Sequence, residues 1–127
     1  MNEQLLPAVQ KAYDINRWLL PCVQRFPRNY KFTLGDRLQT TGLDLNLALV
    51  EAAHSQSKQR PLYRANRLLD QLRILLRLAR DLEIISARQH EHISRWNEEL
   101  GRMIGGWIRA SRQERHGASG AASLNRS

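Results

Sequence analysis

Apolar residues recur every three or four positions along most of the chain, which is the period of an α-helix with one buried face. The first such segment covers residues 5–25. Its apolar stripe contains Leu5, Val9, Ala12, Asn16, Leu19 and Val23, widened by Leu6, Tyr13 and Leu20. Pro7 suits the first turn of a helix, whereas Pro21 removes an internal hydrogen bond. We therefore expect one helix that continues through Pro21 with a bend.

A second helix is predicted over residues 34–55. Its stripe contains Leu34, Leu38, Thr41, Leu45, Ala48 and Ala52. Residues 26–32 are predicted to form a loop, because Pro27 biases the residue before it away from helix. Thr33 is the expected N-cap, with Asp36 three residues later. Gly42 in mid-helix costs about 1 kcal/mol relative to Ala, which predicts a close helix–helix approach there.

Two further helices are predicted over residues 61–82 and 86–113. Pro61 fits a first helical position, and Ser86 is a candidate cap. In the third helix the buried sector is expected to hold Leu68, Leu69, Leu72, Leu75, Leu76, Ala79 and Leu82. In the fourth helix it is expected to hold Ile93, Trp96, Leu100, Met103, Trp107 and Ala110. Gly101 and Gly105 lie one turn apart and indicate tight packing.

Four amphipathic helices with short connections predict an all-α fold, an antiparallel up-down four-helix bundle over residues 1–114. From Gly117 onward the composition changes to Gly, Ala and Ser, so residues 115–127 are predicted to be a disordered tail.

The charge balance points to an anionic partner. Lys and Arg number 20 against 12 Asp and Glu, for a net charge of +8 and a pI near 10.8. All the basic residues except Lys11, Lys31 and Lys58 are Arg, whose guanidinium binds phosphate in bidentate geometry. A basic surface that only keeps the protein soluble is the alternative.

Arginines border the predicted buried faces in stripes. At about 100° per residue, Arg60, Arg64 and Arg67 fall on one flank of the third helix and Arg73, Arg77 and Arg80 on the other. On the fourth helix Arg88, Arg95, Arg102 and Arg109 repeat every seven residues, nearly two turns. Glu91 and Glu98 offer intrahelical salt bridges to the first two, which leaves Arg102 and Arg109 freer for a partner. The second helix is the acidic one, with Asp36, Asp44 and Glu51.

No catalytic, metal or cofactor site is expected. Cys22 is the single cysteine, so neither an intrachain disulfide nor a Cys-based zinc site is possible. His90 and His92 lie two residues apart and point to different helix faces, so they cannot share a metal ion. There is no phosphate-binding Gly loop or nucleophile motif. The lack of these motifs predicts a protein that is not an enzyme. With no signal peptide and no apolar run of about 20 residues, we expect a cytoplasmic protein.

Four stretches resemble one known family. They are FPRNYKFTLGDRL at 26–38, RAN at 64–66, the Leu- and Arg-rich run at 72–82, and GRMIGGW at 101–107. In order and spacing they resemble the accessory variability determinant (Avd) proteins of diversity-generating retroelements, over residues 5–109. Broader relatives are four-helix bundles associated with intervening sequences in 23S ribosomal RNA genes.

The resemblance implies a homopentamer of four-helix bundles with no catalytic residues. Such a protein binds the retroelement reverse transcriptase and its template RNA in support of mutagenic cDNA synthesis. DNA and RNA/DNA hybrid remain alternative nucleic-acid ligands. We expect nucleic-acid or polymerase contacts from Arg28, Lys31, Arg60, Arg64, Arg67, Arg102 and Arg109. Candidate subunit-interface residues are Arg73, Arg77, Arg80, Asp36, Asp44 and Glu51. The alternative is a stand-alone bundle of the ribosomal intervening-sequence kind, which acts as an RNA-associated or protein-interaction module.

Overall fold

The computed structural model describes the backbone of residues 5–125 and the side chains of residues 7–113. Its long helices are α1 (Leu5–Gln24), α3 (Asp36–His54), α4 (Gln59–Asp81) and α5 (Ala87–Asn125). A short helical corner joins α1 to α3, made of α2 (Arg28–Tyr30) and a π-helical turn, η1 (Lys31–Gly35). The predicted disordered tail, residues 115–127, lies outside the described side chains and stays a prediction.

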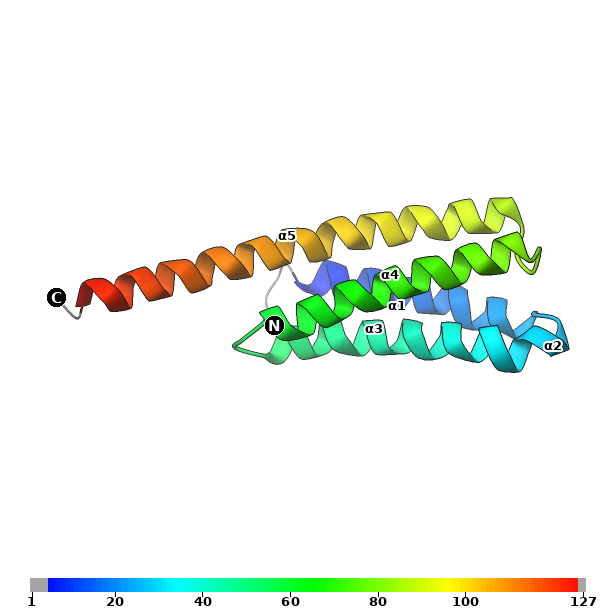
Figure 1. Cartoon of the computed structure of the whole chain (residues 1–127), viewed down its shortest axis with the longest axis horizontal. Helices are drawn as coiled ribbons and strands as arrows, with labels where there is room; N and C mark the ends of the chain where they lie inside the picture. Colours follow the sequence, from blue (N-terminus) through cyan, green and yellow to red (C-terminus); the bar gives the residue numbers. More distant parts are fainter. Residues whose placement is uncertain (1–4, 126–127) are drawn as a thin grey trace.

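The four long helices form an antiparallel up-down bundle, so the predicted fold class is confirmed. In the bundle α1 packs against α3 and α5, and α4 packs against α3 and α5. Figure 1 shows an elongated rod with α5 extending past the other three helices. The α1–α3 corner and the α4–α5 turn lie at one end, and the α3–α4 turn lies at the other.

The helical period identified most of the core. Every residue of the predicted α3 stripe is buried, as are Ala12, Asn16, Leu19 and Val23 of α1. Tyr13 and Leu82, which were expected to lie in the buried sectors, are 52% and 44% exposed. Trp96, Met103 and Ala110 of α5 are only half-buried. On that helix the buried face is turned toward Asn97, Ile104 and Ile108, because α5 must face both α1 and α4.

The predicted loop at residues 26–32 is correct only for residues 26–27, and residues 28–32 are helical. Pro27 is extended, with ψ at 145°, and breaks the chain between α1 and α2. Its carbonyl then accepts the N–H groups of Tyr30 and Lys31 at 2.9 and 3.0 Å, which starts a helical turn that runs directly into α3. The predicted Thr33 cap is wrong for the same reason. Thr33 lies inside this turn, and its hydroxyl donates to backbone carbonyls, as a helix-interior threonine does.

The other helix ends follow the sequence more closely. α1 continues through Pro21, as expected. α4 begins at Gln59, so Pro61 stands in its first turn, where an N–H is not needed. The Ser86 cap is confirmed: its Oγ accepts the Gln89 N–H at 3.0 Å, and the Gln89 side chain accepts the Ser86 N–H at 2.8 Å. Between α4 and α5, Glu83 adopts a φ of 61°, the left-handed residue that ends a helix.

Candidate nucleic-acid interface

The first turns of α4 carry the clearest basic surface. Arg60, Arg64 and Arg67 are all exposed and step by four and three along one side of the helix. Among the described residues none of the three has a carboxylate within ion-pair distance. Their charge is therefore not neutralised within the bundle and is available to a phosphate group.

Helix α5 adds one arginine to this end of the bundle that the sequence did not single out. Arg112 donates to the hydroxyl of Tyr63 in the first turns of α4. Its guanidinium also lies 5.5 Å from the centre of the Tyr63 ring, a cation–π contact. No local pattern links residues 49 positions apart, so only the packing of α4 on α5 reveals this pair.

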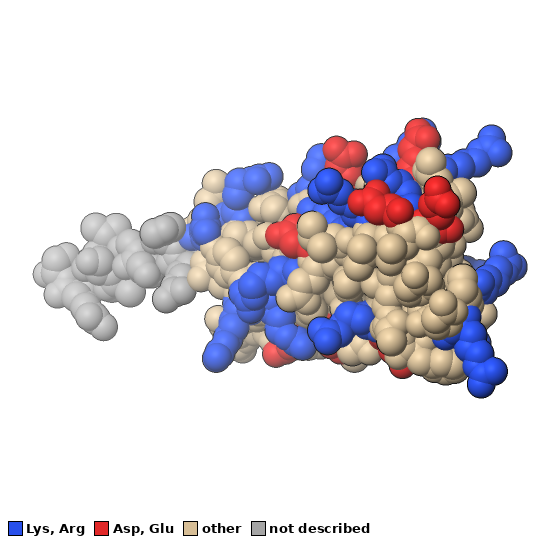
Figure 2. All heavy atoms as spheres, turned by 45° about the vertical axis from the view of Figure 1, so that its right-hand side comes forward, with Lys and Arg blue, Asp and Glu red and all other residues tan. Residues whose placement is uncertain are grey.

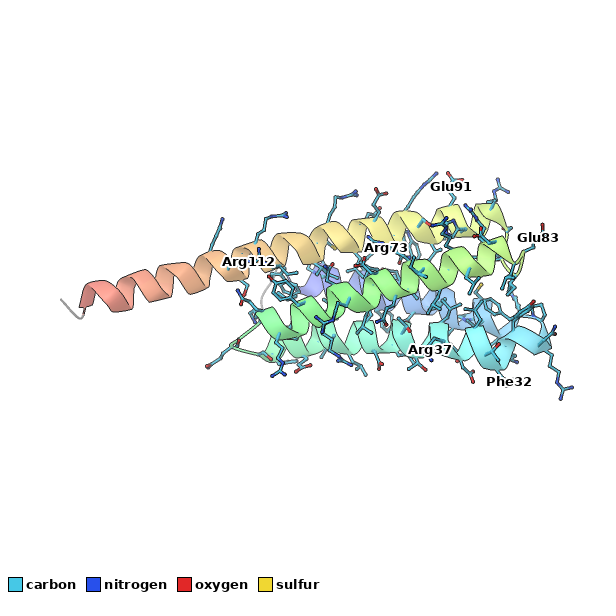
Figure 3. The ribbon with its side chains drawn as sticks, in the orientation of Figure 1. Phe32, Arg37, Arg73, Glu83, Glu91 and Arg112 are labelled. Atoms are coloured by element: carbon cyan, nitrogen blue, oxygen red, sulfur yellow. The ribbon has the colours of Figure 1, made fainter. Side chains whose placement is uncertain are left out.

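The basic corner at residues 28–32 is not part of the same surface. Arg28 is exposed, and the Lys31 ammonium lies 5.7 Å from the centre of the Phe32 ring. Figure 3 shows Phe32 and Arg112 at opposite ends of the bundle. Figure 2 likewise shows basic side chains at both ends of the visible face, with acidic ones interspersed along its upper edge. Arg28 and Lys31 therefore lie at the opposite end of the bundle from the first turns of α4.

The arginines of α5 divide only partly as the sequence suggested, because Glu91 pairs with Arg95 and Arg88 has no ion pair among the described side chains. Arg95 pairs with Glu91, four residues before it, at 2.9 Å, and not with Glu98. Arg102 and Arg109 are exposed and have no ion pair among the described side chains. Nearby, Lys11 of α1 bonds Glu99 at 2.6 Å; this hydrogen bond and charge lower the pKa of the Glu99 carboxyl, with Arg102 adding to the effect.

The arginines on the second flank of α4 form hydrogen bonds and ion pairs within the chain. Arg73 donates to Asp70 at 3.0 Å and to the Asn97 carbonyl of α5 at 3.1 Å. It passes over Gly101, where a Cβ would lie 2.5 Å from its Nη2, the end of a flexible side chain, and 3.6 Å from the nearest methyl of Leu69. The close contact expected at this glycine is therefore with the movable end of Arg73. At Gly105 the expectation is wrong, because an added Cβ would meet only the side chain of Arg109. Arg80 pairs with Asp81 at 3.1 Å, and Arg77 reaches the same carboxylate only at 4.0 Å.

The outer face of α3 combines carboxylates with exposed leucines. Asp36 and Glu51 are exposed and Asp44 is half-buried. Between them Leu43 is 44% exposed and Leu47 is 64% exposed. Leu43 and Leu47 lie one helical turn apart, so this face carries a small exposed apolar surface beside the carboxylates.

Aromatic rings meet on the α1–α5 face, which the sequence did not predict. His92 lies between Trp18 and Trp96, with ring centroids 6.1 and 4.7 Å apart. Lys11 lies 5.6 Å from the centre of the Trp96 ring. The rings of Trp18 and Trp96 are thus already in contact with neighbouring side chains, so they are poorly placed to stack on nucleobases.

The described residues show no metal-binding cluster of His, Cys, Asp and Glu. His90 lies 3.5 Å from Ser94, whereas His92 faces the tryptophans, so the two imidazoles do point apart as expected. Burial raises the pKa of the Cys22 thiol, which keeps it protonated and a poor metal ligand. Within the described part of the chain, none of the helices is long and apolar enough to cross a membrane.

The fold and this surface define a class: a basic four-helix bundle with exposed arginines that form no ion pair with the described side chains. The chain belongs to the bAvd-like family, whose model matches residues 6–111. This match confirms the resemblance to Avd proteins that residues 5–109 indicated. A search of curated proteins found no match.

Proposed function

We propose that this protein is the accessory factor of a diversity-generating retroelement. In this role it binds the reverse transcriptase and the template RNA or cDNA and supports mutagenic reverse transcription. Family membership supports the biological setting. The nucleic-acid contact is supported by the exposed group Arg60, Arg64 and Arg67, which has no ion pair with any described residue.

The contact with nucleic acid is made mainly through phosphate. Guanidinium groups on an exposed helix reach the backbone of a nucleic acid regardless of its sequence. The aromatic rings of Trp18 and Trp96 contact His92 and Lys11, so base stacking contributes little. Binding is therefore tolerant of sequence and sensitive to salt.

Self-association into a homopentamer is the second part of the proposal. The acidic and apolar face of α3, with Leu43 and Leu47 exposed, supports contact with another protein surface. A ring needs an interface between two different patches of the same chain. With assembly through α3, the arginines of α4 and α5 remain available to RNA and the polymerase. We further propose a cytoplasmic, non-catalytic protein.

The test is a triple charge reversal, Arg60→Glu, Arg64→Glu and Arg67→Glu. We expect single-stranded RNA affinity to fall at least about tenfold, and the slope of log K against log salt to fall by about 2, for three lost phosphate contacts. Fluorescence anisotropy over a salt series measures both. The helical circular dichroism signal and the assembly size should not change.

The matched control reverses three other exposed arginines, Arg17, Arg37 and Arg95, one on each of three helices. It changes the net charge equally but leaves the α4 group intact, so most of the affinity should remain. Equal losses in both variants would show that only net charge matters. Loss of assembly in the α4 variant would instead place these arginines at a subunit contact.

A further inference from the structure

The outer side of α4 changes from basic to apolar halfway along the helix. Its first turns carry the arginine group described above. The same steps of four and three then lead to Ile74 and Leu78, and Leu82 follows at the C-cap. These three side chains are 63%, 45% and 44% exposed. They form a row of large aliphatic side chains, the α4 apolar stripe, which the described part of the chain leaves open to solvent.

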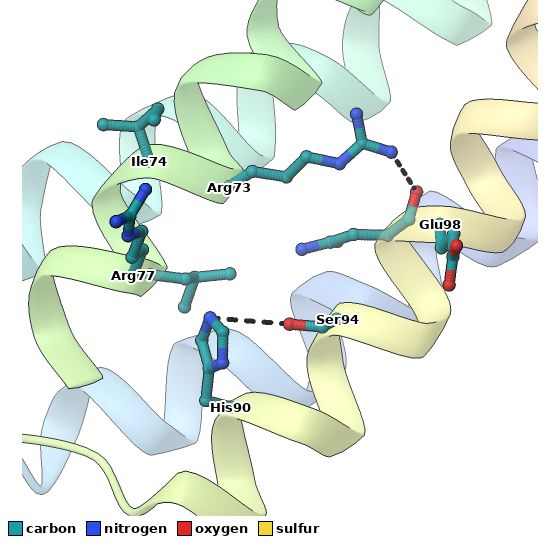
Figure 4. Close-up of a pocket in the computed structure, with 8 residues that line it drawn as sticks. Arg73, Ile74, Arg77, His90, Ser94 and Glu98 are labelled. Atoms are coloured by element: carbon teal, nitrogen blue, oxygen red, sulfur yellow. Dashed lines mark hydrogen bonds between the residues drawn. The ribbon is translucent and has the colours of Figure 1, made fainter. Parts of the chain in front are cut away.

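On the α5 side, the α4 apolar stripe borders an arginine whose charge is poorly balanced. Arg77 is exposed and reaches Asp81 only at 4.0 Å, whereas Arg80 contacts the same carboxylate at 3.1 Å. Figure 4 shows Arg77 and Ile74 on the α4 wall of the cleft between α4 and α5. The guanidinium of Arg77 is therefore available to a carboxylate outside the chain.

On the α3 side, a second arginine borders the stripe. Arg37 lines a groove of about 380 Å³ between α3 and α4, together with Ile74 and Leu75. Arg37 is exposed and has no ion pair among the described side chains. Asp70 lines the same groove, but Arg73 already binds it at 3.0 Å. The stripe thus lies between two arginines with little internal compensation, so a surface that fits it is both apolar and acidic.

The outer face of α3 has this complementary composition. Its exposed Leu43 and Leu47 are one turn apart, the same spacing as Ile74 and Leu78. The three carboxylates of this face form no ion pair with any described residue. The two patches therefore have apolar centres of similar length, one bordered by acidic groups and the other by arginines. Such a pair buries its apolar centre and sets its register through the opposite charges around it.

We propose that the α4 apolar stripe of one copy of this chain binds the outer face of α3 of the next copy. Contact between two different patches joins copies head to tail, which is the arrangement that closes into a ring. The stripe supplies the second patch that the proposed pentamer requires, so the inference rests on that part of the proposed function. The arginine group in the first turns of α4 lies outside this contact and stays available to nucleic acid.

The test starts from two variants that each block one patch. Ile74→Glu with Leu78→Glu blocks the α4 stripe, because it places carboxylates opposite the acidic face of α3. Leu43→Lys with Leu47→Lys blocks the α3 face, because it places ammonium groups opposite the arginines. Burying such charges at the contact is unfavourable, so each variant alone should be monomeric by light scattering. The helical circular dichroism signal should persist in both.

Mixing the two monomeric variants is the decisive experiment. The α3-blocked variant keeps its α4 stripe and the α4-blocked variant keeps its α3 face, so one intact contact can still form between them. Native mass spectrometry of the equimolar mixture should show complexes that contain both variants, the smallest with one copy of each. Contacts that pair α3 with α3, or α4 with α4, could not restore assembly in this way.

Single charges and matched controls test the border of the contact. Arg77→Glu should raise the dissociation constant of the assembly at least about tenfold, because it opposes the acidic face of α3. Arg67→Glu, an exposed arginine of the same helix outside the stripe, should leave it unchanged. Gln24→Glu with Gln56→Glu adds the same charge as the α4-blocked variant at exposed positions elsewhere and should keep the wild-type mass.

The proposal is overturned if the α4-blocked variant keeps the wild-type mass, which would leave the stripe for a different protein partner. It is also overturned if the wild type assembles but the mixture of blocked variants stays monomeric. Either result leaves self-association itself intact. A monomeric wild type instead contradicts the self-association in the proposed function, so the two failures are distinguishable.

Discussion

At the scale of single residues, the contact between α1 and α3 depends on Gly42. The side-chain amide of Asn16 donates to the Gly42 carbonyl at 2.9 Å and to the Ala12 carbonyl at 3.1 Å. A Cβ at position 42 would lie 2.5 Å from the Asn16 Oδ1 and 2.9 Å from the nearest methyl of Leu19. The absence of a side chain at Gly42 is what lets a polar hydrogen bond join two helices inside the core.

We predict that Gly42→Ala destabilises the protein, although alanine favours helix by about 1 kcal/mol. Overpacking a core typically costs about 1–3 kcal/mol, and here it also displaces a buried hydrogen bond. Urea unfolding followed by circular dichroism gives the free energy of unfolding. Gly105→Ala is the matched control: a Cβ there comes no closer than 3.7 Å to the Arg109 side chain, so it should be neutral or stabilising. Stabilisation by both alanines would contradict the close α1–α3 contact.

At the scale of helices and turns, the sequence predicted the start of a helix correctly where the capping side chain is used. Ser86 and Gln89 exchange hydrogen bonds that satisfy two N–H groups at the start of α5. Before α3 the same kind of pattern, with Thr33, is not used, because the helical turn already begins at Arg28. Gly35 permits that earlier start, since a Cβ there would lie 2.8 Å from Val23 of α1.

Ser86→Ala should therefore lower the free energy of unfolding by about 1 kcal/mol, the usual cost of losing an N-cap. Thr33→Ala should stay within about 0.5 kcal/mol of the wild type, as an exposed position away from a cap does. Denaturant unfolding of both variants under one set of conditions makes the comparison. A larger loss at Thr33 than at Ser86 would mean that the helical corner before α3 is not formed in solution.

At the scale of the whole molecule, charge and apolar surface are distributed unevenly. The start of α4 and the corner at residues 28–32 are basic, whereas the outer face of α3 is acidic and exposes Leu43 and Leu47. Helix α1 packs against α3, and its Tyr13 is also exposed. Separation of this kind suits a protein that assembles through one face and binds an anionic partner through another.

We predict that Leu43→Lys together with Leu47→Lys converts the proposed pentamer into monomers, because charged side chains would have to be buried at the contact. Light scattering after size-exclusion chromatography measures the mass, and circular dichroism checks that the helices persist. Gln24→Lys together with Gln56→Lys adds the same charge at exposed positions elsewhere and should leave the pentamer intact. A monomeric wild type would rule out self-association altogether.

Helical period and charge pattern are local properties of the chain, so they were enough to predict the four helices, the up-down bundle, most of the core and the Arg60–Arg64–Arg67 group. The packing of the helices was needed to show that Arg73 is bound within the bundle, that Arg112 contacts Tyr63, and that Phe32 and Arg112 lie at opposite ends. It also decided that the side-chain oxygen of the buried Asn97 receives no hydrogen bond from the described residues. These features depend on which helix faces meet, and residues 24 to 49 positions apart become neighbours only when the bundle closes.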